Sequence, residues 1–397
     1  MESSVVSRKL DQAVGFLREA GIDLWIAQFA RESYEQPTPV DTLAVGCSVT
    51  WPAAFLVAAS GRRTAIVGTG DVANVRAAGV YDEVVGYVQD VAVPLREVMS
   101  DVNPTRVAVS YSVADDMADN ITHGMFLMLQ GILAGTPYFD CLVPAEGILG
   151  KLRAYKLPVE VRRIQDAIEM THQLFGLMPQ LLREGVTESE LADRLRGEGR
   201  ARGGAPAWDP RYDPIVNFGP GSGFGHSEPG TVALAPGMLV HIDLGLKVEG
   251  YCSDLQRTWY VLRPSESEAP LEVQEAFAAV RVSMDAGFET LRPGIPGWTA
   301  DRQARDALLR AGYAESEFAF GHQLGQTAHD GGALLGPPWP RYGTRPEMPL
   351  GEGMVFAIEQ AVPTEAGPIG LEDDVLITAG GAEYLSQPQT ALEYVRL

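Results

Sequence analysis

Hydrophobic and polar positions follow a mixed pattern of helix and strand periods over the first 150 residues. An amphipathic run with helical spacing begins after Ser4 and stops at Gly21, which predicts an N-terminal helix. Short apolar runs between turn-rich segments predict strands at 23–28, 53–58, 63–67 and 106–110. Helices that alternate with strands are typical of an α/β domain with a mixed or parallel sheet.

The pattern changes after this region. A long amphipathic run that begins after Pro158 predicts one long helix, and Thr187 and Glu190 have the spacing of a capping box for the next helix. The other expected elements are helices near 271–291 and 299–311 and strands at 213–218, 238–246, 250–261, 353–362 and 371–378. We therefore expect two domains, 1–154 and 155–397.

Composition is typical of a globular protein of more than one domain. The chain has 397 residues, of which 46% are hydrophobic and 21% charged. That length exceeds the roughly 100–200 residues of a common domain. The formal net charge of −21 repels phosphate backbones and anionic lipid, so we expect no binding to nucleic acid or to membranes.

The sequence gives no sign of secretion. Cys47, Cys141 and Cys252 are far apart and form no CxxC pair, so neither a disulfide framework nor a thiolate zinc site is expected. The N-terminal segment carries charges throughout, unlike a signal peptide, and no uncharged apolar stretch approaches about 18 residues. We expect a cytoplasmic protein.

Acidic side chains interrupt several of the apolar strand patterns. Asp243 and Asp254 fall on the two strands of a predicted hairpin, where they can face the same side across the ladder. Glu359 and Glu372 each break another apolar run. A charge within a buried strand needs a partner, because an isolated charge is costly to bury.

These carboxylates would repel one another if the fold brought them together. Four carboxylates form six pairs, each worth roughly 4 kcal/mol at 4 Å and an effective dielectric near 20, so the total is on the order of 20 kcal/mol. Two divalent cations would cancel the four charges, and His322, one of two histidines in the segment 320–332, would add a nitrogen donor. Such an oxygen-rich set with one imidazole suits Mn, Co, Fe or Zn.

The order of these motifs resembles that of the pita-bread metallopeptidases, which include prolidase, aminopeptidase P, methionine aminopeptidase and the non-peptidase creatinase. The matching segments are IDLG with Asp243, GYCSD with Asp254, GHQLGQTAH with His322 and His329, AIEQ with Glu359 and LEDD with Glu372. The resemblance extends over nearly the whole chain. It implies a creatinase-like α/β N-terminal domain, an α+β pita-bread catalytic domain and a homodimer.

The resemblance also implies roles for the matching residues. Asp243 would hold one of two divalent ions (Mn, Co or Zn), Asp254 and Glu372 would bridge both, and His322 and Glu359 would hold the other.

Three residues would carry the catalytic steps. Glu359 would also shuttle a proton, and His329 would steady the oxyanion. An upstream match, YDPIVNFGPGSGFGHSEPG, places His226 where the family keeps a substrate-facing histidine.

Some positions depart from the family pattern. Gly370 stands where the family often carries a substrate-binding arginine, Gln256 replaces the usual threonine, and Phe318 occupies a position that is often histidine. None of these positions is an expected metal ligand.

The proline- and glycine-rich segment 333–350 offers a replacement for the arginine. There Arg341 or Arg345 would clamp a free carboxylate, while Trp339 or Tyr342 packs against a proline ring. The alternative is a solvated surface loop.

The favoured function is hydrolysis of the Xaa-Pro bond in dipeptides, as in prolidase, with a small peptide as the substrate. Three alternatives remain open. The first is an aminopeptidase P that releases the N-terminal residue from longer Xaa-Pro peptides. The second is a creatinase-like hydrolase or a lyase that acts on a non-peptide molecule, and the third is a non-catalytic binding protein.

Overall fold

The computed structural model describes residues 4–34, 38–222, 225 and 227–397. His226, for which the sequence predicts a substrate-facing role, lies outside the described residues. The chain divides into two compact units, Met1–Arg153 and Ala154–Leu397. Among the described residues, none of the helices combines the length and the apolar character that a membrane crossing requires.

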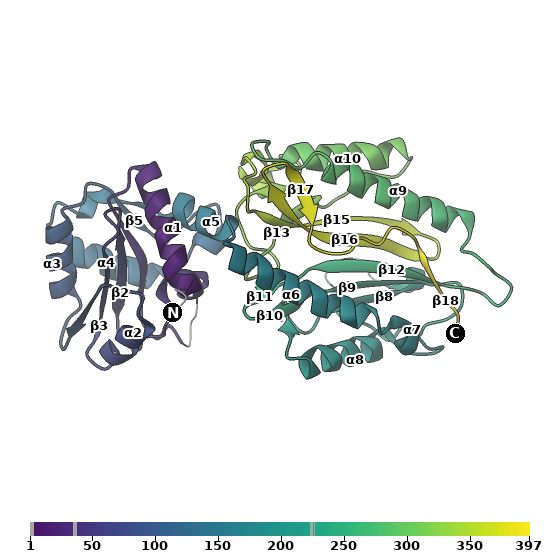
Figure 1. The fold of residues 1–397 in the computed structure, drawn as a ribbon, viewed down its shortest axis with the longest axis horizontal. Helices are drawn as coiled ribbons and strands as arrows, with labels where there is room; N and C mark the ends of the chain where they lie inside the picture. The colour runs from purple at the N-terminus through teal and green to yellow at the C-terminus, as the bar shows by residue number, and fades with distance from the viewer. Residues whose placement is uncertain (1–3, 35–37, 223–224, 226) are drawn as a thin grey trace. The chain divides into compact units, whose positions relative to one another are not determined.

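The first unit is built on a mixed sheet. Its strands are β1 (Leu24–Ala30), β2 (Ala53–Ala58), β3 (Arg63–Gly68), β4 (Glu83–Tyr87), β5 (Val107–Val109) and β6 (Leu142–Pro144). They lie in the order β4-β3-β2-β1-β5-β6, and β1 pairs antiparallel with β2 but parallel with β5 (Figure 1). The sequence predicted four of these strands and missed β4, which is partly exposed, and β6, which is very short.

Helices cover both faces of this sheet. They are α1 (Val5–Ala20), α2 (Val72–Ala78), α3 (Ala92–Val102), α4 (His123–Leu133) and α5 (Glu146–Ala154). Ser4 caps α1 by accepting from the backbone N–H of Ser7, and Gly21 ends the helix in the left-handed conformation, as the sequence predicted. Side chains of α1 pack on the face of Trp25, and those of α3 and α4 on the face of Ile26. This unit is the expected α/β domain.

The second unit contains a large sheet and a small one. The strands are β7 (Ala205–Pro206), β8 (Ile215–Phe218), β9 (Leu239–Leu244), β10 (Leu246–Val248), β11 (Tyr251–Cys252), β12 (Leu255–Val261), β13 (Gly321–Gln323), β14 (Leu334–Leu335), β15 (Val355–Thr364), β16 (Gly367–Thr378), β17 (Gly381–Tyr384) and β18 (Glu393–Val395). Within the described residues the large sheet has nine strands, with the path β14-β13-β15-β16-β12-β9-β8, β17 beside β16 and β18 beside β12. The small sheet has the order β11-β10-β7.

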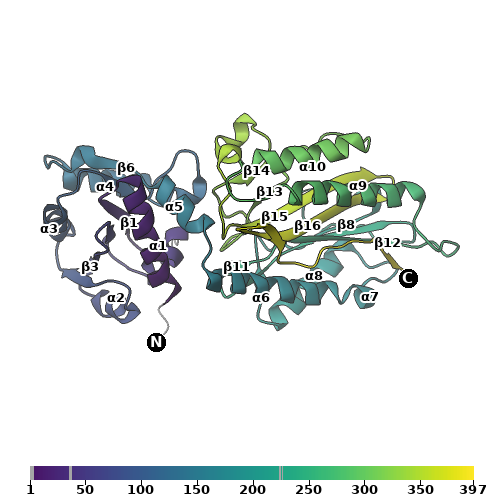
Figure 2. The ribbon, with the colours of Figure 1, turned by 45° about the horizontal axis from the view of Figure 1, so that its top comes forward.

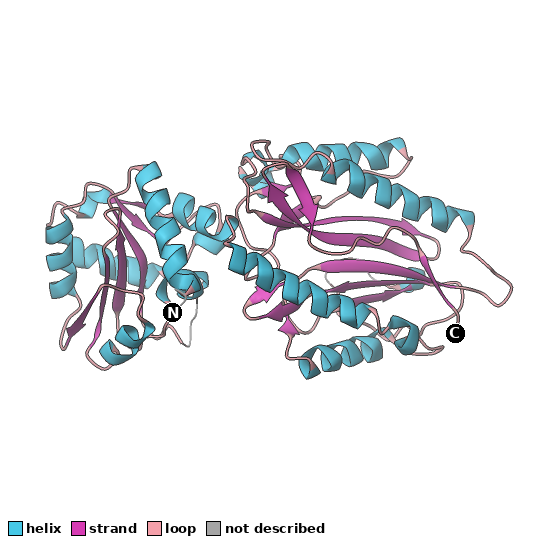
Figure 3. Cartoon of the chain, in the orientation of Figure 1, coloured by secondary structure: helices cyan, strands magenta, loops and turns pink. Residues whose placement is uncertain are grey.

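Helices flank these strands on two sides (Figures 2 and 3). They are α6 (Pro158–Phe175), α7 (Met178–Leu181), α8 (Glu188–Ala201), α9 (Leu271–Phe288) and α10 (Trp298–Arg310). The helix α9 packs on β15 and β16, whereas α6 contacts β10 and β11, and α8 contacts β8. The capping box of Thr187 and Glu190 is present at the start of α8.

The single long helix expected after Pro158 is wrong at its C-terminal end. The helix α6 does begin at Pro158, but it ends at Phe175, and α7 is a separate short helix. Pro179 explains the break, because a proline has no N–H to donate and its ring clashes with the carbonyl four residues earlier, here that of Phe175.

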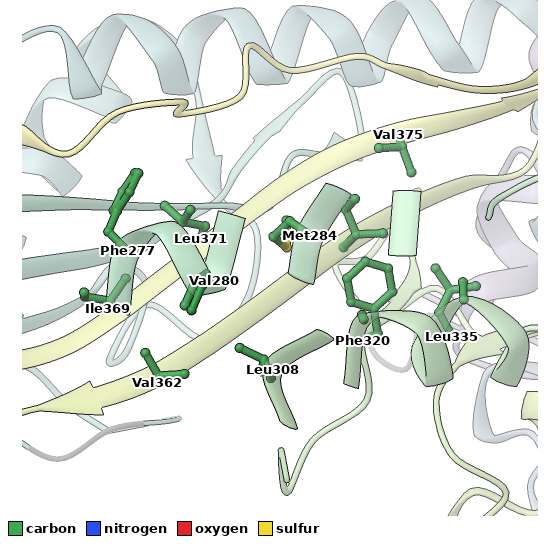
Figure 4. Close-up of a cluster of buried hydrophobic side chains, with 14 of the residues drawn as sticks. Phe277, Val280, Met284, Leu308, Phe320, Leu335, Val362, Ile369, Leu371 and Val375 are labelled. Carbon is green, nitrogen blue, oxygen red and sulfur yellow. The ribbon is translucent and has the colours of Figure 1, made fainter. Parts of the chain in front are cut away.

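One face of β15 and β16 packs against α9 in a hydrophobic core. Functional side chains on these strands must therefore lie on the opposite face. Figure 4 shows the side chains of this core, among them Phe277, Val280, Met284, Ile369 and Leu371. Side chains alternate between the two faces of a strand. Since Ile369 and Leu371 face α9, the residues between and after them on β16, Gly370 and Glu372, face the opposite side of the sheet.

Candidate metal centre

Three carboxylates and one amide form a row across four neighbouring strands. Asp243 of β9 pairs with Gln256 of β12, Gln256 pairs with Glu372 of β16, and Glu372 pairs with Glu359 of β15. Residues directly opposite one another on adjacent strands point to the same face. The register of the sheet therefore gathers side chains that are far apart in the sequence.

Asp254 joins this group from a different position than expected. The expected antiparallel pairing is present between β9 and β12, but the direct partner of Asp243 is Gln256. The chain makes a detour between the two strands, where the backbone N–H and side-chain hydroxyl of Ser253 bond to the backbone of Leu246. Asp254 lies at the end of this detour and lines the same cavity as Asp243.

His322 reaches the group from β13, which pairs with β15. Its Nε2 lies 3.8 Å from Oδ2 of Asp254 and 3.7 Å from Oε1 of Glu372. Its Nδ1 lies 3.0 Å from the carbonyl oxygen of Ala328. A carbonyl oxygen only accepts, so Nδ1 carries the hydrogen and the neutral ring turns the lone pair of Nε2 toward the carboxylates. The lone pair of Nε2 and the ionised carboxylates repel one another unless a cation lies between them.

One cavity of about 220 Å³ brings the predicted ligands together. It is lined by Asp243, Asp254, His322, Glu359 and Glu372, and also by Trp208, Asp209, Tyr212, Ile215, Gln256, Ala328 and His329. The rings of His322 and His329 are 4.2 Å apart between centroids. No lysine or arginine is among the described residues that line this cavity, so its charge is strongly negative when the carboxylates are ionised.

Burial dominates the acid–base behaviour of the cavity. It raises the pKa of Asp243, Asp254 and Glu372 well above the ordinary carboxyl values, and repulsion among the carboxylates raises these values further. Burial also raises the pKa of Glu359 to about 7, although a hydrogen bond from Gln256 opposes this change. Without a compensating positive charge, protonated carboxyl groups are favoured.

The residues fit a divalent metal ion. Ligand atoms of Asp254, His322 and Glu372 all lie within 4.8 Å of one another. Oδ1 of Asp243 is buried and has no hydrogen-bond partner among the described residues. A buried acceptor left in that state costs about 1–3 kcal/mol. A cation would satisfy this oxygen and relieve the repulsion among the carboxylates.

Trp339, Arg341 and Tyr342, for which the sequence predicts substrate contacts, lie together in a group of their own. The guanidinium of Arg341 is 4.8 Å from the ring centroid of Trp339 and 4.7 Å from that of Tyr342, and it donates to the carbonyl oxygen of Glu317. Nε of Arg345 donates to the carbonyl oxygen of Gly332 at 2.8 Å. The four loop side chains are not among the described residues that line the carboxylate cavity. Their role in binding substrate stays a prediction.

Two groups of cavity residues were not found from the sequence. The first is the segment of Trp208, Asp209 and Tyr212, which is held by Asp213, a buried carboxylate that accepts from the backbone N–H of Ala207 at 2.6 Å. An acidic residue before a proline carries no signal of such a role. The second is Gln256, which the sequence marked only as a departure from the family pattern and whose Oε1 lies 2.9 Å from Nε2 of His241.

The family is settled by the extent of the match over the catalytic unit. The sequence profile of metallopeptidase family M24 matches residues 162–379. The chain belongs to this family. This result confirms the resemblance to the pita-bread metallopeptidases.

Individual relatives are similar over the same part of the chain. Protein YkvY of Bacillus subtilis is 30% identical over 249 residues, which are 62% of this chain and 64% of that relative. The Xaa-Pro dipeptidase of Pyrococcus horikoshii is 28% identical over 249 residues, which are 62% of this chain and 66% of that relative. The matched part of the chain thus spans less than two thirds of these relatives' length.

A solved structure extends the similarity in fold to the whole chain. The dipeptidase PepE of Mycobacterium ulcerans has a TM-score of 0.77 at 24% identity, and the alignment covers 100% of both chains. The M24 chain thus has the expected architecture, an α/β N-terminal domain followed by an α+β pita-bread catalytic domain.

Proposed function

We propose that this M24 chain uses two divalent metal ions to hydrolyse the Xaa-Pro bond of dipeptides. The observation that carries the proposal is that four carboxylates and His322 line one cavity, in which the lone pair of Nε2 of His322 faces two of the carboxylates. The Xaa-Pro preference draws support from the relative that is named for that activity. The cavity volume of about 220 Å³ is below the roughly 300–1,000 Å³ of cavities for drug-sized ligands, which favours a short peptide.

Five side chains would hold the ions. They are Asp243, Asp254, His322, Glu359 and Glu372. Two doubly charged cations equal the total charge of the four carboxylates, and oxygen ligands with one imidazole suit Mn, Co or Zn. When bound, such ions polarise a carbonyl oxygen and make water acidic enough to attack near neutral pH.

The protein's own groups would move the proton and steady the substrate. Glu359 would take a proton from the attacking water and pass it to the leaving nitrogen of proline. His329 would donate to the developing oxyanion. His226 stays a candidate for substrate contact, and the rings of Trp208 and Tyr212 offer an apolar wall for the proline ring.

The proposed carbonyl-directed chemistry is compatible with an Xaa-Pro bond. The Xaa-Pro amide has no N–H, so an enzyme cannot recognise it by accepting from that group. A site that acts on the carbonyl group does not need the N–H. We further propose that the protein is a cytoplasmic homodimer, as the resemblance implies.

A panel of substrates tests the proposed function. Leu-Pro, Leu-Ala, a tripeptide with proline in second position and creatine would be incubated with purified protein and added Mn, Co or Zn. We expect hydrolysis of Leu-Pro well above the other three substrates. Faster hydrolysis of the tripeptide would instead indicate an aminopeptidase P, and turnover of creatine alone would indicate a non-peptide function.

A further inference from the structure

We infer that Gln256, held in place by His241, is a positioning residue that fixes how Glu359 and Glu372 present their oxygens to metal. The inference rests on the metal site of the proposed function. It concerns residues outside the ligand set, and one of them, Gln256, stands where the sequence departs from the family pattern.

A single amide group serves both carboxylates. Nε2 of Gln256 donates to Oε2 of Glu359 at 2.9 Å and to Oε2 of Glu372 at 2.9 Å. These two glutamates are direct partners on β15 and β16, so their charges repel at close range. The NH₂ group of Gln256 is the shared donor that holds the two side chains next to each other.

The two oxygens of Glu372 have different neighbours because of this amide. Oε2 accepts from Gln256, whereas Oε1 lies 3.7 Å from Nε2 of His322. The oxygen that faces the metal-binding group is therefore the one that Gln256 leaves free. Without this contact, the carboxylate would be free to turn away from the orientation in which Oε1 faces His322.

His241 fixes the orientation of the amide itself. Both partners of Nε2 of Gln256 are carboxylates, so this atom is the donor and Oε1 is the acceptor. Oε1 lies 2.9 Å from Nε2 of His241, which therefore carries a hydrogen. The other ring nitrogen of His241, Nδ1, lies 2.9 Å from Oδ1 of Asn217. All three side chains are at most 5% exposed.

Gly370 leaves the space that the side chains of His241 and Gln256 occupy. A Cβ atom at position 370 would lie 2.4 Å from Nε2 of His241 and 2.5 Å from Oε1 of Gln256, far inside van der Waals contact. Any side chain at this position would push apart the hydrogen bond that orients the amide. The hydrogen bond between His241 and Gln256 therefore requires a glycine at position 370.

Metal affinity tests the inference without relying on activity. Metal-free protein would be titrated with Mn²⁺ by calorimetry for the wild type, Gln256→Leu, His241→Leu and the double variant. We expect Gln256→Leu to weaken Mn²⁺ binding about 10–100-fold, the usual effect of removing a group that orients a ligand. His241→Leu should weaken it roughly 10-fold. The double variant should equal Gln256→Leu, because His241 acts through Gln256.

Gln360→Leu is the matched control. Gln360 is the same residue type, is also buried, and follows Glu359 directly on β15, but it points to the other face of the strand. Its Mn²⁺ affinity should stay within about 2-fold of the wild type, since it holds no ligand. Gly370→Ala is a second probe, which keeps both Gln256 and His241 and should still weaken Mn²⁺ binding. For the Co²⁺-loaded proteins, the visible absorption should change in Gln256→Leu and Gly370→Ala but not in Gln360→Leu.

The outcomes separate the inference from the proposed function. Wild-type affinity in Gln256→Leu would overturn the inference while the metal site stands. Additive losses in the double variant would overturn the role of His241. A wild-type protein that binds no Mn²⁺, Co²⁺ or Zn²⁺ would overturn the proposed function and the inference with it. Circular dichroism of each variant distinguishes loss of binding from loss of folding, and if Gln256→Leu does not fold, Gly370→Ala decides.

Discussion

Nζ of Lys156 lies 3.1 Å from Oδ2 of Asp330, and both side chains are almost completely buried. Asp330 also accepts from the hydroxyl of Thr327, and its backbone N–H donates to the carbonyl oxygen of Gln323. These contacts close the loop that carries His329. The ion pair therefore joins the start of the catalytic unit to a loop of the metal centre.

Breaking this ion pair should destabilise the protein strongly. Removal of one partner of a buried pair leaves an uncompensated charge, so Lys156→Met should lower the free energy of unfolding by about 3–5 kcal/mol. Urea unfolding at constant metal concentration measures the change. The control is Arg163→Met, which removes the exposed pair with Glu249 and should cost less than about 1 kcal/mol. Equal effects of the two substitutions would contradict the prediction.

Asp254→Ala should abolish hydrolysis but preserve the fold. It removes a carboxylate that lines the cavity, whereas the backbone N–H of Asp254 keeps its bond to Asp374. We expect kcat/KM to fall by more than about 100-fold, since loss of a ligand exceeds the usual effect of losing its supporting group. Assays with Leu-Pro and saturating metal would measure it. Full activity of the variant would contradict the ligand assignment.

Asp213 should make the stability of the metal-free protein depend on pH. Burial raises its pKa from the ordinary value of 3.8 to about 7. The folded state thus holds its proton more tightly than the unfolded state. The stability it contributes is fully present below about pH 4 and is lost as pH rises through about 7, by up to about 1.4 kcal/mol for each pH unit. Asp213→Asn, unfolded in urea between pH 5 and 8, should show a flatter profile than the wild type.

Removal of metal should lower the melting temperature, and more so at alkaline pH. An ion that binds only the folded state adds about 2.7 kcal/mol when its concentration is 100 times Kd. The raised pKa values of Asp243, Asp254 and Glu372 make protons compete with metal, so binding strengthens as pH rises. Thermal unfolding with Mn²⁺ or with a chelator, at pH 6 and pH 8, measures both effects. An identical shift at both values would contradict the proton competition.

The arginines of the 333–350 loop have a kinetic test. If Arg341 or Arg345 binds the carboxylate of a dipeptide equally in the ground and transition states, its replacement by alanine raises KM more than it lowers kcat. Leu-Pro and its C-terminal amide would be compared, because only the free acid should respond. Unchanged kinetics for both variants would exclude this role.

The sequence predicted four of the carboxylates that line the cavity, because charges within apolar strands are costly to bury and therefore rare. Asp243, Glu359 and Glu372 each interrupt such a strand, and the motif around His322 fixes its place among them. Helix boundaries set by local chemistry were also predictable, such as the start of α6 at Pro158 and the capping box of α8. Each of these features is recognisable from the few residues that flank it in the sequence.

Features that depend on the register between strands could not be read from the sequence. Gln256 looks like an ordinary polar residue until the detour before β12 places it opposite Asp243 and Glu372. The ion pair of Lys156 and Asp330 joins residues 174 positions apart. An amide or a lysine gives no local sign of its distant partner, so only the fold reveals either role.

The row of Asp243, Gln256, Glu372 and Glu359 also has a consequence for biosynthesis. Its members come from strands that leave the ribosome at very different times, and a slip of one residue in any strand would turn its side chain to the opposite face. A half-made chain thus has no complete chelating site with which to capture an unsuitable ion. Under the proposed function, a metal ion would therefore bind only after these strands have paired.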